Sequence, residues 1–208
     1  QETEFLVILN RTCNRFFSNS ITWKELQKTI TFLLKSLQDW ADDVKKVQAI
    51  LDIVQLLEMK LEERSCESDW VVYESITDCS DAILNIVQGV VNRQDPKTIE
   101  AVYQSLLHAF HKDKLSGEHF VFSSLLCLCA LPEYRKKLEE FLQYQQAVST
   151  EYERRELAEQ QFQILKRYGT PQEQNDFINR HLSNPEYRRM AIQNAIDAGD
   201  ESTVERLA

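Results

Sequence analysis

Apolar side chains recur every three or four positions along nearly the whole chain, the spacing that places them on one face of an α-helix. The first such stripe joins Phe5, Leu9, Cys13 and Phe16 and predicts a helix of about four turns. No stretch shows the sustained polar–apolar alternation of a half-buried strand. Because even the β-branched pair Val90-Val91 lies inside a helical stripe, the pattern predicts helices throughout.

Polar and special residues divide this pattern into separate helices. Thr22 and Thr150 each precede a glutamate by three residues, which is the capping box of a helix N-terminus. Proline at a first helical position indicates further helix starts, and glycine just after a stripe indicates helix ends. The predicted proline starts are Pro96, Pro132, Pro171 and Pro185, and the predicted glycine ends are Gly169 and Gly199.

Three stretches depart from the regular amphipathic pattern. Residues 77–81 are polar and short-chained, which is typical of a kink or break in a helix that starts near residue 68 or 69. A break is also expected near 148–150, although one long helix from Pro132 through that point fits the pattern as well. Residues 118–130 are apolar on nearly every side, which predicts a helix in the centre of the fold.

These elements add up to an all-α chain of about ten or eleven antiparallel helices with short connections. So many helices are hard to pack around one centre, so we expect the hairpins to stack side by side as a TPR-like α-α superhelix. Residues 131–136 (Leu-Pro-Glu-Tyr-Arg-Lys) are echoed by residues 184–189 (Asn-Pro-Glu-Tyr-Arg-Arg), as in a repeat. We expect a single helical-repeat domain over residues 1–208, with 1–130 and 131–208 as candidate subregions.

Composition agrees with helices and narrows the class of partner. Four Gly and four Pro in 208 residues are too few for the many tight turns of a sheet protein. The 33 acidic and 24 basic residues give a formal net charge of -9, which disfavours nucleic acid or an anionic membrane as the main partner. The partner that we expect is a protein or a peptide.

The sequence also favours a cytoplasmic location. Glu2 and Glu4 stand where the basic end of a signal peptide would lie, and the apolar run 120–131 is far shorter than a membrane span. Five cysteines, an odd number in a chain of this size, favour reduced thiols. Because the chain starts at Gln1 and residues 204–208 look like an interrupted helix, we also expect it to be a piece of a longer protein.

The only cluster of candidate metal ligands is His108, His111 and His119, close in sequence to Cys127 and Cys129. His108 and His111 share a helical face, and zinc can bridge such a pair. The two cysteines would point about 200° apart on a helix and could not both close on one ion. We therefore treat the three histidines as weak metal candidates and expect no bound metal or cofactor.

Other catalytic patterns are missing from the sequence. There is no Gly-x-Ser-x-Gly nucleophile elbow, no Glu-x-x-His pair of a di-iron bundle and no glycine-rich phosphate loop. The cysteines lie in helical stripes rather than at helix N-termini, where a thiolate would be stabilised. The sequence therefore predicts no catalytic and no cofactor-binding residue.

The last quarter of the chain has a more specific pattern. Its components are Phe177-Ile178, Leu182, Pro185, Tyr187-Arg188, Ile192, Ala195-Ile196, Gly199-Asp200 and Leu207-Ala208. This pattern resembles the helical-repeat region of bacterial SWIM zinc-finger proteins. The resemblance implies an α-α superhelix and a zinc-binding module elsewhere in the parent chain. Because the Cys-x-Cys and Cys-x-His pattern of that module is absent here, the resemblance assigns no metal ligand to these residues.

Three hypotheses about function follow. The leading one is a non-enzymatic α-helical repeat module that acts as a protein–protein interaction scaffold, because no catalytic constellation is visible. The second is a helical domain with metal-dependent hydrolase or nucleic-acid-processing activity around His108, His111 and His119. The third is a regulatory helical domain that dimerises through residues 120–131.

Overall fold

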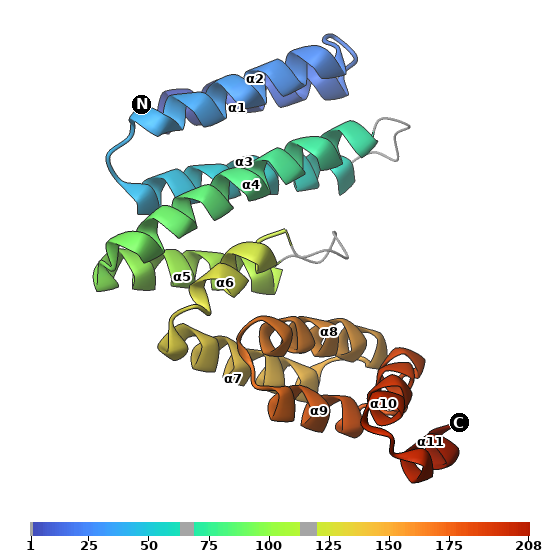
Figure 1. Cartoon of the computed structure of the whole chain (residues 1–208). Helices are drawn as coiled ribbons and strands as arrows, with labels where there is room; N and C mark the ends of the chain where they lie inside the picture. The colour runs from blue at the N-terminus through green and yellow to red at the C-terminus, as the bar shows by residue number, and fades with distance from the viewer. Residues whose placement is uncertain (1, 63–68, 113–119) are drawn as a thin grey trace. The chain divides into compact units, whose positions relative to one another are not determined.

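The structure is a computed structural model that describes residues 2–62, 69–112 and 120–208 (Figure 1). These residues form eleven α-helices and one 3-10 turn and contain no strand, which confirms the predicted all-α class and number of helices. No helix in this part of the chain combines the length and apolar character needed to cross a bilayer. The chain divides into two compact units, unit 1 (Gln1–Leu128) and unit 2 (Cys129–Ala208).

Unit 1 consists of three helical hairpins stacked in two layers (Figure 1). Its helices are α1 (Glu2–Phe17), α2 (Trp23–Ser36), α3 (Asp43–Glu62), α4 (Asp69–Arg93), α5 (Pro96–Lys112) and α6 (Phe122–Leu128), with the 3-10 turn at Leu37–Asp39. The two helices of each hairpin contact each other, and each of the first four helices also contacts the helix two places further on, as in α1 with α3 and α2 with α4. One layer therefore contains α1, α3 and α5, and the other contains α2, α4 and α6.

The core of unit 1 is built mainly from aliphatic side chains. They are spaced three or four residues apart on each helix, in agreement with the stripes in the sequence. Fully buried examples are Leu9, Leu26, Ile30, Val47, Ile50, Ile83, Val87, Val102, Leu106 and Leu125. Burying one such side chain contributes about 1.5–3 kcal/mol relative to leaving it exposed, so this core is the main stabilising contribution in unit 1.

Helix α4 runs without a break through residues 77–81, so the expected kink or break there is wrong. Its polar side chains have partners that leave the helical backbone intact. The Thr77 hydroxyl donates to the Tyr73 carbonyl at 3.0 Å, one turn back. The Ser80 hydroxyl donates to the Phe120 carbonyl at 2.6 Å and so connects α4 with the residues before α6.

The helix expected over residues 118–130 is shorter in the structure, where α6 covers only Phe122–Leu128. Residues 118 and 119 lie outside the described residues, and residues 129 and 130 form a turn. The expected burial is correct, because Val121, Phe122, Leu125 and Cys129 are all buried. The helix is shorter than the apolar run because the run also includes buried residues of the adjoining turns, such as Val121 and Cys129.

Unit 2 is a succession of helices in which each packs mainly on the next. They are α7 (Pro132–Val148), α8 (Glu151–Tyr168), α9 (Pro171–Arg180), α10 (Pro185–Ala198) and α11 (Glu201–Leu207). Thr150 and Thr170 cap α8 and α9, and their backbone amides donate to Glu153 and Glu173 at 2.8 and 2.6 Å. Because α7 ends before Thr150, the alternative of one long helix is wrong.

Two glycines end helices of unit 2 as predicted, for different reasons. Gly199 after α10 has a φ of 70°, a left-handed conformation that glycine adopts at little cost. Gly169 after α8 is extended instead, with a φ of -87°. A Cβ at Gly169 would lie 2.6 Å from the Leu165 carbonyl oxygen, so the tight end of α8 requires a residue without a side chain.

The core of unit 2 centres on an aromatic cluster of Phe162, Phe177, His181 and Tyr187. The ring of Phe177 lies 5.4 Å from Phe162 and 4.0 Å from His181, in stacked geometry. The Tyr187 ring meets Phe162 and Phe177 edge-on at 5.3 and 5.5 Å. Because these rings come from α8, α9 and α10, one cluster holds three consecutive helices together.

Candidate binding groove

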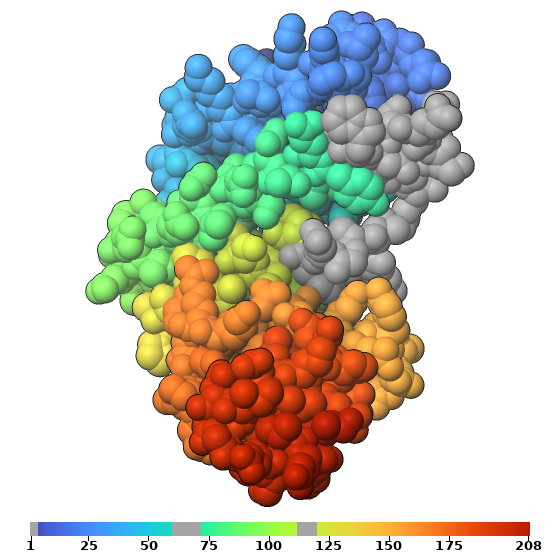
Figure 2. Space-filling view, turned by 45° about the vertical axis from the view of Figure 1, so that its right-hand side comes forward, coloured from blue at the N-terminus to red at the C-terminus, as the bar shows by residue number. Residues whose placement is uncertain are grey.

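An open groove of about 670 Å³ lies on unit 1, lined by α2, α3 and α4. Helix α2 and the turn after it contribute Thr31, Leu34, Lys35, Leu37 and Gln38; α3 contributes Asp43, Lys46 and Ile50; and α4 contributes Asp78, Ala82, Asn85, Ile86, Gly89 and Arg93. Leu37 and Ile50 are almost fully buried, so they form the floor. In Figure 2 the green surface of α4 runs beside the blue surface of the first hairpin.

The groove face of α4 is a second stripe beside its buried one. Its residues are three or four positions apart, which places them on one side of the helix. The buried stripe of α4 includes Ile76, Ile83, Val87 and Val90. Ala82 and Gly89 have the smallest side chains of the groove face, and they leave open the space that larger residues would fill.

Gly89 is not required by the backbone or by packing. It lies inside a continuous helix of 25 residues. A Cβ built there meets only the Arg93 Nη1 atom, at 3.5 Å, which is an ordinary contact. Glycine inside a helix costs about 0.5–1 kcal/mol relative to alanine. Unit 1 therefore carries a destabilising residue at a position where alanine would fit, and that position faces the groove.

One end of the groove is rich in cations. Asp43, in the first turn of α3, pairs with Lys46 at 3.1 Å and with Arg93 in the last turn of α4. The ends of α2 and α4 and the start of α3 lie on the same side of unit 1 (Figure 1). A second hollow of about 450 Å³ shares Asp43 and Arg93 and adds Lys97. The Lys35 side chain lines the groove and forms no ion pair or hydrogen bond with the described residues.

The α4 side of the groove carries an uncompensated carboxyl group. Burial raises the pKa of Asp78, and the neighbouring carboxylates Glu74 and Asp81 raise it further. None of the described residues forms an ion pair or a hydrogen bond with the Asp78 side chain. Asp78 and Lys35 are thus charged groups of opposite sign that both line the groove and have no ion-pair or hydrogen-bond partner among the described residues.

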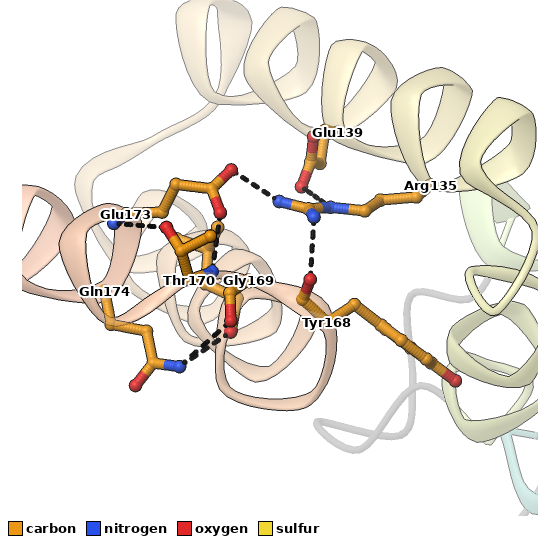
Figure 3. A network of polar contacts seen from close by, with 8 residues as sticks. Arg135, Glu139, Tyr168, Gly169, Thr170, Glu173 and Gln174 are labelled. Atoms are coloured by element: carbon orange, nitrogen blue, oxygen red, sulfur yellow. Dashed lines mark hydrogen bonds and ion pairs between the residues drawn. The ribbon is translucent and has the colours of Figure 1, made fainter.

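The most extensive polar network lies in unit 2, around Arg135 (Figure 3). The Arg135 guanidinium donates to Glu139, to the Tyr168 carbonyl and to Glu173, each at 2.8 Å. The Thr170 amide and hydroxyl, and then Arg135, hold the pKa of the Glu173 carboxyl below its usual value. Because α7 supplies the arginine while its partners include the end of α8 and the start of α9, the network is a clamp on that joint.

The Tyr187 hydroxyl forms a second polar contact in unit 2, donating to Glu159 at 3.0 Å. Burial raises the pKa of Tyr187, and the Glu159 carboxylate adds to this rise. The His181 ring nitrogen Nδ1 is 2.8 Å from the Phe177 carbonyl oxygen. These groups therefore satisfy one another inside the aromatic cluster, so we assign them to folding rather than to a site.

Among the described residues, the predicted metal candidates His108 and His111 are not part of a group of metal ligands. His108 and His111 are both exposed on α5, and His119 lies outside the described residues. Cys127 is half-buried in α6, whereas Cys129 is buried in the turn that follows. Among the residues that the structure describes, no three His, Cys, Asp or Glu side chains are grouped as metal ligands.

The described cysteines form no disulfide with one another, and Cys79 is fully buried in α4. Burial, and then the nearby Asp78 carboxylate, raise the pKa of the Cys79 thiol to about 12. A thiol with such a pKa is almost wholly protonated at neutral pH and is a poor nucleophile. Cys66, the cysteine near a predicted break, lies outside the described residues.

Sequence reasoning missed the groove residues. The groove could have been recognised from a second stripe on α4 and from a glycine inside a helical pattern. The residues of that stripe are Asp78, Ala82, Asn85, Gly89 and Arg93. The polar residues 77–81, which include Asp78, instead suggest a kink or break when only the sequence is considered. Comparisons with known protein families, with curated proteins and with solved structures found no match to this chain.

Proposed function

We propose that this chain is a non-enzymatic helical-repeat module that binds a protein or peptide partner in the groove between α2 and α4. The observation that supports this most is Gly89, because it lowers helix stability where alanine would fit and keeps the groove face open. Stacked hairpins are suited to this role, since they create extended surfaces on a rigid support.

The third hypothesis, dimerisation through residues 120–131, has less support. Val121, Leu125 and Leu128 are fully buried within the chain, and Phe122 and Cys129 are nearly so. Little of this segment's apolar surface is therefore left for a second copy. The metal-dependent alternative lacks a grouped ligand set in the described residues, as reported above for His108 and His111.

The test is selection of peptides from a library of random dodecapeptides displayed on phage, followed by affinity measurements with the synthetic peptides. Replacing Ala82 by tryptophan should fill the groove and lower the affinity at least about tenfold. The matched control is Ala198→Trp, an equally small residue exposed near the end of α10. Circular dichroism of both variants confirms that the helices are intact. Peptides that bind both variants equally well would contradict a binding role for the groove.

The resemblance of residues 177–208 to SWIM zinc-finger proteins, with the cytoplasmic location that we expect, stays a prediction. Sequencing the gene on both sides of these residues tests it directly. A Cys-x-Cys segment followed by Cys-x-His would support membership in that family, and its absence would remove the resemblance as an argument.

A further inference from the structure

The groove on unit 1 has a charge asymmetry that specifies what can bind in it. Lys35, Lys46 and Arg93 lie at the end where α2 and α4 finish, and Asp43 neutralises only part of their charge. Asp78 lies on α4 fifteen residues before Arg93, with the carboxylates of Glu74 and Asp81 near it. A rise of about 1.5 Å per residue places the two positions about 22 Å apart along the helix.

Both ends present a charge that none of the described residues neutralises fully. Lys35 and Asp78 form no ion pair or hydrogen bond with the described residues. Gln38 and Asn85, which line the groove as well, likewise have no side-chain hydrogen bond within the described part of the chain. A ligand can therefore satisfy these groups without first breaking contacts of the folded chain, apart from displacing water.

The side chains that line the groove favour an extended ligand over a helical one. Gln38 and Asn85 offer amide groups to a ligand, and the backbone groups of a helix are already paired within the helix, whereas those of an extended segment are free to pair. An extended chain covers about 3.3 Å per residue, so about seven residues span the distance of about 22 Å between the two ends. Its backbone amides and carbonyls would also find Gln38 and Asn85 as partners.

We propose that the groove binds an extended segment of a partner protein that carries a Lys or Arg opposite Asp78 and an Asp or Glu about seven residues away, opposite the basic end that Lys35, Lys46 and Arg93 form. This inference rests on the proposed scaffold function and adds the chemistry of the partner. Ala82 and Gly89, between the two charged ends, accommodate the apolar or small side chains of the segment. The net charge of -9 on the whole chain disfavours purely acidic segments, and the basic end disfavours purely basic ones.

The random dodecapeptide selection on the full chain tests this chemistry. The selected peptides should share a basic and an acidic residue about seven positions apart. Replacing Lys35 by glutamate should weaken a selected peptide about 3- to 10-fold, and changing the acidic residue of the peptide to lysine should restore its affinity for that variant. Asp78→Lys should behave in the opposite sense, with recovery by a peptide whose basic residue is glutamate.

The outcomes separate this inference from the function on which it rests. Peptides that lose affinity with Ala82→Trp but show no charged pair, or no recovery on charge reversal, would overturn the charge-paired segment and leave the scaffold function intact. Peptides that bind independently of Ala82, or a selection that enriches none, would overturn both. Arg188→Glu, a charge reversal at an exposed position in unit 2, controls for the change in net charge.

Discussion

Unit 1 and unit 2 are both helical, but different interactions hold their helices together. In unit 1 the contacts run within each hairpin and also between helices two places apart in the chain, and the buried side chains are mainly aliphatic. In unit 2 the contacts run mainly between consecutive helices, and aromatic rings and the Arg135 clamp join them. The first unit is a regular stack, and the second depends on a few individual side chains.

This difference indicates where the chain can carry a binding surface. Burial of aliphatic groups is non-directional, so unit 1 can hold small and charged residues on the groove face while its core stays intact. Ring stacking and arginine forks depend on geometry, so unit 2 has few positions that can change without loosening a joint. We therefore expect single substitutions to affect stability most in unit 2 and binding most in unit 1.

The largest effect should come from Phe177→Ala. Phe177 is 2% exposed and contacts three other rings, so its removal leaves a cavity and should lower the free energy of unfolding by about 3–5 kcal/mol. Denaturant unfolding measures the loss, and hydrogen exchange locates it in unit 2. Phe32→Ala is the matched control, since Phe32 is 63% exposed and its loss should change stability by less than about 0.5 kcal/mol. Similar losses for the two variants would contradict the central role of the cluster.

Next comes the arginine clamp. Arg135→Ala removes three contacts at 2.8 Å and leaves the Tyr168 carbonyl without that donor, so we expect a loss of about 2 kcal/mol. Arg188 occupies the same position in the echoed segment but is exposed, and Arg188→Ala should be nearly neutral. Thermal unfolding of both variants measures the difference. If Arg135→Ala and Arg188→Ala lower the melting temperature equally, the clamp does not stabilise the α8–α9 joint.

Ser80→Ala examines whether unit 1 also depends on a single polar contact. The variant loses the hydrogen bond to the Phe120 carbonyl, so we expect a loss of about 1 kcal/mol. Ser105→Ala is the control, because the Ser105 hydroxyl donates only to Ala101 one turn back in its own helix. Denaturant midpoints of the two variants give the comparison. A loss above that of Arg135→Ala would reverse the ranking of the two units.

Two glycine substitutions should change stability in opposite directions. Gly89→Ala fits the helix without a clash and should raise the free energy of unfolding by about 0.5–1 kcal/mol. Gly199→Ala places a side chain at a φ of 70° and should lower it by about 1 kcal/mol. Melting temperatures measure both. A destabilising Gly89→Ala would mean that glycine is needed there for folding, and would remove the main support for the groove.

The smallest expected effect is on pH dependence. Hydrogen bonds from Thr170 and Arg135 lower the pKa of the Glu173 carboxyl below the usual 4.5 of a glutamate. The carboxylate therefore stabilises folded unit 2 at pH values above 4.5, and this contribution disappears as the pH falls through the lowered folded-state value. Glu173→Gln should flatten the acid side of the stability curve. Glu205→Gln, at an exposed glutamate of the same unit, should leave that curve unchanged.

Much of the local structure could be predicted because its causes are local. Thr22, Thr150 and Pro185 begin helices where expected, since capping and proline geometry act within one turn. The errors arose where a distant residue decides the outcome. The polar residues 77–81 looked like a break because the partner of Ser80, the Phe120 carbonyl, is forty residues away.

The residues of the candidate site are harder to predict from the sequence than the helix boundaries are. The metal hypothesis rests on three histidines that are close in sequence, and the structure places two of them, His108 and His111, at exposed positions of α5. The sequence does not indicate that Lys35 and Asp78 belong to one site, because they are more than forty residues apart. They line the same groove only because α2 packs beside α4. Gly89 was the one residue whose local cost could have drawn attention to the groove.

The sequence by itself determined the helical class, most helix ends and the apolar stripes, because hydrophobic periodicity and capping are properties of neighbouring residues. Only the tertiary structure decided that the first six helices stack in two layers and that aromatic rings join α8, α9 and α10. It alone also showed that Lys35 and Asp78, which have no partner in the part of the chain that the structure describes, line the same α2–α4 groove. The physical reason is that packing and electrostatics depend on distances in space, which the order of residues along a chain does not contain.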